Sequence, residues 1–117
     1  MYRDLCPVSF FDVYIDNGFW GNRQKINSDT TIYSIYERFK ETGRFDAFKF
    51  DWKEGSPNKP HEFWDSDVAK WLEAAAYILA RKNDKKLEAL VDGIVDLIEK
   101  NQDESGYFNI YFTVVEP

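Results

Sequence analysis

The chain has 117 residues, a formal net charge of −6 and 44% hydrophobic residues. This length allows one domain, and the apolar fraction is that of a globular rather than a disordered protein. The excess of acidic over basic residues argues against nucleic acid or a membrane surface as partner, and no apolar run approaches the ~20 residues of a spanning helix.

The N-terminal residues lack the apolar core and small-residue cleavage site of a secretory signal peptide, which predicts a cytoplasmic protein. Cys6 is the single cysteine, so no internal disulfide is expected. Residues 7–15 are rich in Val, Phe, Tyr and Ile and precede a turn at residues 16–18, which predicts a short strand. Because no second strand-like run lies nearby, this strand would need a partner from elsewhere.

Residues 19–42 have a helical pattern. Apolar side chains recur at i, i+3, i+4 and i+7 from Ile32 to Phe39, and Gly43 supplies the expected stop. Residues 44–62 are irregular, because Gly and Pro interrupt them and aromatic residues are scattered among them. A loop of this length inside a domain is usually functional or wrongly assigned.

The clearest helix is predicted over residues 66–81, with Asp65 as its N-cap and Asp67 near the positive end of its dipole. Apolar side chains run along it in two stripes, which is typical of a helix buried on several sides. After a tight turn, residues 85–101 form a further helix with one apolar stripe, and hence one covered face. The two helices are antiparallel, so the first begins at the end where the final loop, residues 102–117, leaves the second.

These elements predict a mainly α chain with roughly three helices, a short N-terminal strand and long loops. One helical hairpin cannot enclose an inner helix, whereas a ring or stack of hairpins can, as in double-ring α/α barrels and solenoids. We therefore interpret residues 19–117 as the first helices of an incomplete helical ring or solenoid. Residues 1–18 form a separate N-terminal strand segment in this interpretation.

Four side chains are candidates for binding a sugar. Asp65 and Asp67 suit acid–base work or hydrogen bonds to hydroxyl groups, although carboxylates at a helix start more often serve as a cap and a dipole partner. Tyr107 and Asn109 belong to a loop rich in rings, residues 106–112. Stacking faces beside an amide are typical of carbohydrate recognition, and packing of the rings under the loop is the alternative.

The remaining residues and motifs do not predict a metal site or a catalytic residue in this chain. His61 is the only histidine and has no Cys or His neighbour at ligand spacing, so no metal site is predicted. Glu73 either faces solvent or pairs with a basic group such as Lys70. Phosphate loops and Ser or Cys triads are absent from the sequence, so no catalytic residue is assigned.

Two stretches carry a family resemblance: residues 63–77, which read FWDSDVAKWLEAAAY, and residues 106–117, which read GYFNIYFTVVEP. They resemble glycoside hydrolase family 127, the bacterial β-L-arabinofuranosidases. Residues 7–20 are similar to the opening of that family. Two positions depart from its pattern, since Ala69 stands where Tyr is common and Ile110 where Thr is common.

The resemblance implies a six-hairpin helical barrel followed by β-sandwich domains, in an enzyme that removes terminal β-L-arabinofuranose with retention. It also implies a zinc-bound cysteine nucleophile and a glutamate acid/base, which lie in later parts of that barrel. Neither has a counterpart here, and Cys6 stands in the wrong region. The chain alone is therefore expected to be inactive and to hold no cofactor, with the four candidate side chains at the wall of the sugar pocket.

Three hypotheses for the chain follow. It is a segment of a longer glycoside hydrolase, or a stand-alone module that kept a carbohydrate-binding rim, or a subunit that completes a barrel in trans with the missing remainder.

Overall fold

The structure, a computed structural model, describes residues 5–117, so the first part of the predicted segment 1–18 lies outside the described residues. The elements in chain order are the 3₁₀ turn η1 (Phe10–Asp12), α1 (Gly18–Ile26), the π-helix η2 (Asn27–Thr31), α2 (Ile32–Glu41), the 3₁₀ turn η3 (Asp46–Lys49), α3 (Trp64–Leu79), α4 (Lys85–Asn101) and α5 (Tyr111–Val114). The chain is mainly helical, as predicted. Within residues 5–117, no helix combines the length and apolar content that crossing a membrane requires.

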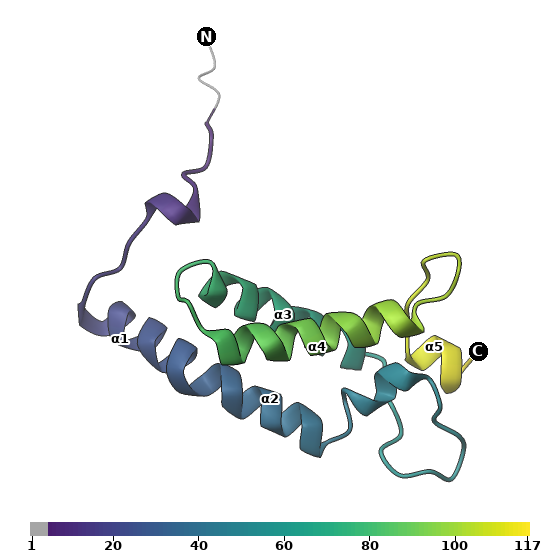
Figure 1. Ribbon diagram of the computed structural model, residues 1–117. Coiled ribbons are helices and arrows are strands. Elements are labelled where there is room, and N and C mark those ends of the chain that lie inside the picture. The colour runs from purple at the N-terminus through teal and green to yellow at the C-terminus, as the bar shows by residue number, and fades with distance from the viewer. Residues whose placement is uncertain (1–4) are drawn as a thin grey trace.

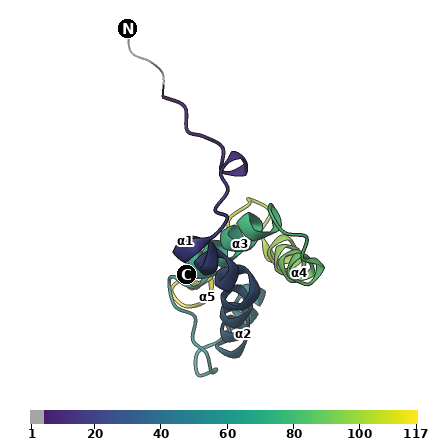
Figure 2. The same cartoon turned by 90° about the vertical axis from the view of Figure 1, so that its left-hand side faces the viewer.

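The core gathers around α3, which packs against both α2 and α4 (Figures 1 and 2). Buried apolar side chains come from α2, from the loop after it, from both helices of the hairpin and from the C-terminal loop. They are Ile32, Phe45, Ala47, Phe48, Val68, Trp71, Ala75, Leu87, Ile94 and Ile110. Segments far apart in the sequence therefore share one apolar cluster.

The bounds of α4 confirm the prediction for residues 85–101. Asp84 precedes it, and its Oδ1 accepts a hydrogen bond of 3.1 Å from the backbone N–H of Leu87. This bond satisfies one of the free donors of the first turn. Leu87 and Ile94 are buried, whereas Val95 is 48% exposed. One face of α4 is covered, as its single apolar stripe indicated.

The prediction that Asp65 caps α3 is wrong. The helix begins at Trp64 and its N-cap is Phe63, so Asp65 lies in the first turn beside Asp67. The chain already turns upstream, where the Trp64 N–H donates to the carbonyl of His61 at 3.1 Å. The carboxylate of Asp65 instead accepts a hydrogen bond of 2.7 Å from the next backbone N–H.

The second apolar stripe of α3 is only partly covered. Of its three residues, Trp71 is buried and Ile78 is partly buried, but Ala74 is exposed. Neighbouring helices cover one side of α3, and on its other side the predicted burial is incomplete within the described chain.

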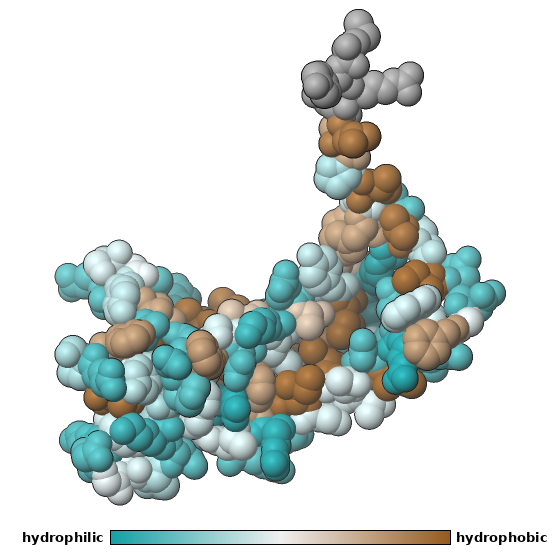
Figure 3. All heavy atoms as spheres, turned by 180° about the vertical axis from the view of Figure 1, so that it is seen from behind, coloured by the Kyte–Doolittle hydropathy of each residue, from teal (hydrophilic) through white to brown (hydrophobic). Residues whose placement is uncertain are grey.

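The strand predicted over residues 7–15 does not form. The Oγ of Ser9 accepts a hydrogen bond of 3.3 Å from the N–H of Phe11 and begins a 3₁₀ turn. No strand occurs in the described part of the chain, and a lone strand leaves its N–H and C=O groups unpaired. The segment instead projects from the helices, with hydrophobic side chains along it (Figures 1 and 3). The radius of gyration, 17.8 Å, accordingly exceeds the about 13 Å of a compact domain of this length.

Residues 19–42 are helical as predicted, but a π-helix interrupts them at Asn27–Thr31. The hydroxyls of Ser28 and Thr31 donate to the carbonyls of Lys25 and Ile26, at 3.1 and 3.4 Å. After the π-helix, the apolar side of α2 turns towards α3. Its predicted stripe is confirmed at the core except for one residue, Ile35, which is 38% exposed.

The irregular segment over residues 44–62 supplies part of the core. Ala47 and Phe48 of η3 are buried. The ring of Phe108 in the C-terminal loop packs edge-on against Phe48 and Phe50, with both centroid distances 5.1 Å. Phe108 therefore packs in the core, which agrees with the alternative interpretation that rings of residues 106–112 pack under the loop.

Candidate functional site

The first turn of α3 brings Asp67 against Arg44. The Oδ2 atom of Asp67 lies 3.4 Å from the Nε of Arg44, and its Oδ1 lies 3.8 Å from the Nζ of Lys70. The Arg44 and Asp67 side chains are 24% and 32% exposed, so this pair is half-buried. The N-terminal end of the α3 dipole also favours a carboxylate here. Asp67 is therefore an acceptor with a defined position, still reachable from solvent.

Arg44 is held from both sides. Its guanidinium carbon lies 5.1 Å from the ring centroid of Phe39 and 5.3 Å from that of Trp64. Its Nη1 donates a hydrogen bond of 2.6 Å to the Oγ1 of Thr42. Stacking on rings and a fixed donor fork restrict the guanidinium, which in turn restricts the carboxylate of Asp67.

Arg44 is the residue of this site that the sequence prediction missed. Its one sequence signal was its place directly after the Gly43 stop of the preceding helix. The contact itself joins residues 23 apart and depends on how α2 and α3 pack.

The other three candidates do not join this pair through hydrogen bonds within the described chain. Asp65 bonds to its neighbouring backbone N–H. The N–H of Tyr107 donates to Asp103 at 3.0 Å, and the Tyr107 side chain is 54% exposed. The Oδ1 of Asn109 accepts from the N–H of Phe112 at 2.9 Å. Each is fixed within its own segment.

The C-terminal loop nevertheless lies at the end of the hairpin where α3 begins (Figure 1). The pKa of Tyr111 is raised, first by its hydrogen bond of 2.8 Å to Glu116, then by burial, and in part by the charge of Glu62. Glu62 lies two residues before α3 begins at Trp64. The first turn of α3 and the C-terminal loop therefore lie at the same end of the hairpin (Figure 1), and the role of Asp65, Asp67, Tyr107 and Asn109 in a pocket wall stays a prediction.

This arrangement offers hydrogen-bond acceptors and a stacking face. Among residues 5–117, no three His, Cys, Asp or Glu side chains gather closely enough to hold a metal ion. Cys6 is exposed, and the His61 ring packs on Phe63 with a centroid distance of 5.2 Å. The residues present therefore do not fit the zinc site that the family resemblance implies, and we derive no chemical step through zinc.

Comparison with known proteins gives one family and one curated relative. Residues 12–116 match the family described as beta-L-arabinofuranosidase, GH127 catalytic domain. A stretch of 52 residues is 50% identical to a non-reducing end beta-L-arabinofuranosidase of Bifidobacterium longum subsp. longum. This stretch covers 44% of the chain but only 8% of the length of that relative. No solved structure shows a significant match.

Proposed function

This chain belongs to the GH127 catalytic-domain family of beta-L-arabinofuranosidases, and from that membership we propose that it is part of a cytoplasmic glycoside hydrolase. The intact enzyme removes non-reducing terminal β-L-arabinofuranose with retention. The observation that carries the proposal is the family match, which runs from residue 12 to residue 116. The relative that shares 50% identity over 52 residues is named for the same activity.

Within that enzyme, the residues of this chain bind sugar and leave the bond cleavage to groups elsewhere. Asp67, restrained by Arg44, accepts hydrogen bonds from sugar hydroxyls, which carboxylates bind strongly and directionally. Tyr107 offers an exposed face on which a sugar ring stacks, and Asn109 and Asp65 add polar groups at the rim. We expect the isolated chain to be inactive, because the family resemblance puts the nucleophile and the acid/base in later parts of the barrel.

The fold supports a place in a double-ring α/α barrel. We take α3 as an inner helix and α4 as an outer one, because α4 has one covered face while α3 has apolar residues beyond the side that α2 and α4 cover. Residues 8–15 have exposed apolar side chains, which we expect to pack against a β-sandwich domain of the intact enzyme. We therefore propose two parts of the chain, an N-terminal segment over residues 1–18 and the first helices of the barrel over residues 19–117.

Exposed apolar side chains also favour a second candidate, in which the chain completes a barrel in trans with a separate polypeptide. Phe19, Trp20 and Tyr77 are 62%, 68% and 51% exposed. Burial of such rings against a partner releases free energy in proportion to the apolar area removed from water. A stand-alone carbohydrate-binding remnant is the third candidate, and the exposed Tyr107 ring is its support.

The test compares the purified chain with the same chain co-expressed with the polypeptide encoded next to it in the genome. We expect no turnover of an aryl β-L-arabinofuranoside by the chain alone and zinc-dependent turnover by the complex or longer protein. In that active form, Asp67→Ala should lower kcat/KM by about tenfold or more, because a charged hydrogen bond to substrate is lost. Asp96→Ala, on the exposed side of α4, is the matched control and should leave kcat/KM unchanged.

Turnover by the chain alone would contradict the expected inactivity. Saturable binding of arabinose oligomers by the isolated chain, without turnover in any complex, would favour the carbohydrate-binding remnant.

A further inference from the structure

Arg44 contacts the start of α3 because of the way the chain leaves α2. Gly43 follows the helix with a φ of +78°, and the N–H of Arg44 then donates a hydrogen bond of 2.9 Å back to the carbonyl of Phe39. Glycine is the usual residue at such a helix end, because a side chain is strained in the left-handed region. A Cβ at Gly43 would also lie 2.9 Å from the Nδ2 atom of Asn58. The sharp turn at Gly43 therefore fixes where the Arg44 side chain begins.

The guanidinium of Arg44 has contacts on every side but one. The rings of Phe39 and Trp64 lie over it, with centroid distances of 5.1 and 5.3 Å. Its Nε lies 3.4 Å from Asp67, and its Nη1 donates a hydrogen bond of 2.6 Å to the hydroxyl of Thr42. That hydroxyl donates its own proton to the last turn of α2, so its position is fixed as well. The edge of the guanidinium that is left carries Nη2.

This Nη2 atom is free to bind a ligand. Within residues 5–117, the hydrogen bonds of the Arg44 side chain come from Nε and Nη1 alone. Nη2 also reaches solvent, because no buried side-chain nitrogen or oxygen in the described part of the chain lacks a partner. The side chain as a whole is 24% exposed. A guanidinium that is held in place and has a free edge is well prepared to donate hydrogen bonds to an oxygen beside Asp67.

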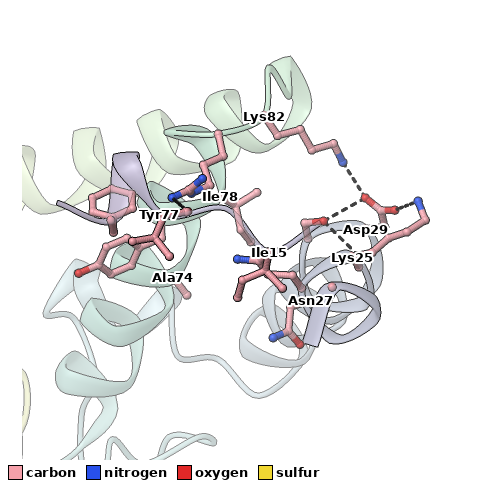
Figure 4. Close-up of a pocket in the computed structure, with 14 residues that line it drawn as sticks. Ile15, Lys25, Asn27, Asp29, Ala74, Tyr77, Ile78 and Lys82 are labelled. Atoms are coloured by element: carbon pink, nitrogen blue, oxygen red, sulfur yellow. Dashed lines mark hydrogen bonds and ion pairs between the residues drawn. The ribbon is translucent and has the colours of Figure 1, made fainter. Parts of the chain in front are cut away.

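Basic side chains at the other end of α3 are engaged more fully. Lys25 and Lys82 each lie 2.8 Å from a different carboxylate oxygen of Asp29 (Figure 4). Lys82 also lies 3.4 Å from Asp84. The planar fork of Arg44, in contrast, has more N–H groups than its one carboxylate and one hydroxyl engage. Ion pairing within the fold therefore accounts for these lysines but not for the free edge of Arg44.

We propose that Arg44 binds the sugar directly and determines specificity. Its Nη2 donates to one oxygen of the bound sugar, while the carboxylate of Asp67 accepts a hydrogen bond from the adjacent hydroxyl. Adjacent hydroxyls on a furanose ring suit a donor and an acceptor that themselves lie side by side. The pair thus recognises two neighbouring hydroxyls, and a sugar that lacks either one leaves a charged group without its partner. The inference rests on the proposed function, which places this end of α3 in the sugar pocket.

The test uses the active form of the enzyme and aryl β-L-arabinofuranosides that keep both adjacent ring hydroxyls or lack one or the other. Arg44→Lys keeps a cation beside Asp67 but has no planar fork, so it should lower kcat/KM for the parent substrate about tenfold. The analogue without the oxygen that Arg44 binds should react about tenfold more slowly with the unmodified enzyme, and Arg44→Lys should not slow it further. For the other analogue, Arg44→Lys should still cost about tenfold.

Arg38→Lys is the matched control. Arg38 lies on the last turn of α2, and its side chain is 74% exposed in an ion pair with Glu41. The change should leave kcat/KM unchanged for all the substrates. Thermal unfolding shows that each variant is folded, and the comparison of substrates on the unmodified enzyme requires no substitution at all.

The outcomes separate this inference from the proposed function. A loss with Arg44→Lys that is equal for the parent substrate and both analogues would overturn the inference, because Arg44 would then act only by holding Asp67. No loss with Arg44→Lys, beside a tenfold loss with Asp67→Ala, would also overturn it and leave the proposed function standing. If no form of the enzyme turns over the parent substrate, the proposed function fails, and this inference fails with it.

Discussion

The indole Nε1–H of Trp71 donates a buried hydrogen bond of 2.9 Å to the backbone carbonyl of Ile32. Trp71 lies in the middle of α3, and Ile32 is the residue at which the π-helix gives way to α2. The rings of Tyr36 and Phe45 pack on Trp71, with centroid distances of 5.4 and 6.3 Å. One side chain therefore joins the first helical region to the hairpin through both a polar and an aromatic contact.

Replacing Trp71 with Phe should destabilise the chain by about 2 kcal/mol. The change removes the hydrogen bond, worth ~1 kcal/mol, and leaves unfilled volume in the core that adds a similar cost. Urea unfolding followed by far-ultraviolet circular dichroism measures the difference.

Trp20→Phe is the matched control, since Trp20 is 68% exposed, and its effect should stay within about 0.5 kcal/mol. Equal losses in the two variants would show that the Trp71–Ile32 bond contributes nothing to stability.

The Arg44–Asp67 pair should show measurable coupling in a double-mutant cycle. The coupling energy of a half-buried pair with restrained side chains is larger than that of the usual exposed pair. We therefore expect a coupling energy of about 1 kcal/mol from the cycle of Arg44→Ala, Asp67→Ala and the double variant. The exposed pair Arg38–Glu41, with side chains 74% and 65% exposed, is the control. Its coupling should be within about 0.3 kcal/mol. A zero coupling for Arg44–Asp67 would remove Arg44 from the proposed site.

Asp84 should make the stability of the hairpin depend on pH. The N–H of Leu87, the Tyr33 hydroxyl and Lys82 together hold the pKa of Asp84 below its ordinary value. A lowered folded-state pKa means that the stabilisation is complete above the unfolded pKa of about 3.9 and is lost as the pH falls through the folded pKa. Thermal midpoints measured from neutral pH downwards should therefore fall in acid.

Asp84→Asn keeps a cap oxygen but has no charge to lose, so its midpoint should fall less steeply in acid than that of the unmodified chain. Asp84→Ala, without any cap, should be the less stable variant at neutral pH. Parallel pH profiles for the unmodified chain and Asp84→Asn would contradict the assignment.

Lys82 should hold the π-helix against the turn between α3 and α4, because it reaches Asp29 across 53 residues. Lys82→Met should speed amide hydrogen exchange over Asn27–Thr31 several-fold, since local opening no longer has to break this tertiary ion pair. Lys25→Met removes the ion pair with Asp29 four residues later in the same helical run. It should increase amide exchange less than Lys82→Met does. Equal exchange in Lys82→Met and the unmodified chain would show that the tertiary pair is not needed for the π-helix.

Local signals made the α3–α4 hairpin predictable. The apolar stripe defines α4 within its own residues, so its bounds agree with the prediction. The candidate site was predicted in part: Asp67 lies in the first turn of α3 as expected, because charge near a helix start is a local matter. The partner of Asp67 was not predictable, since Arg44 reaches it only through the packing of α2 on α3.

The sequence by itself determined helix content and most helix positions, because periodicity, caps and stops act over a few residues. Tertiary structure decided three features. A strand does not form over residues 7–15, since no described strand supplies its hydrogen bonds. Residues 27–31 widen into a π-helix where Lys82 holds Asp29. Phe48 in the short turn η3 and Ile110 in the C-terminal loop are buried, because contacts between distant segments rather than local propensity decide which side chains outside the long helices join the core.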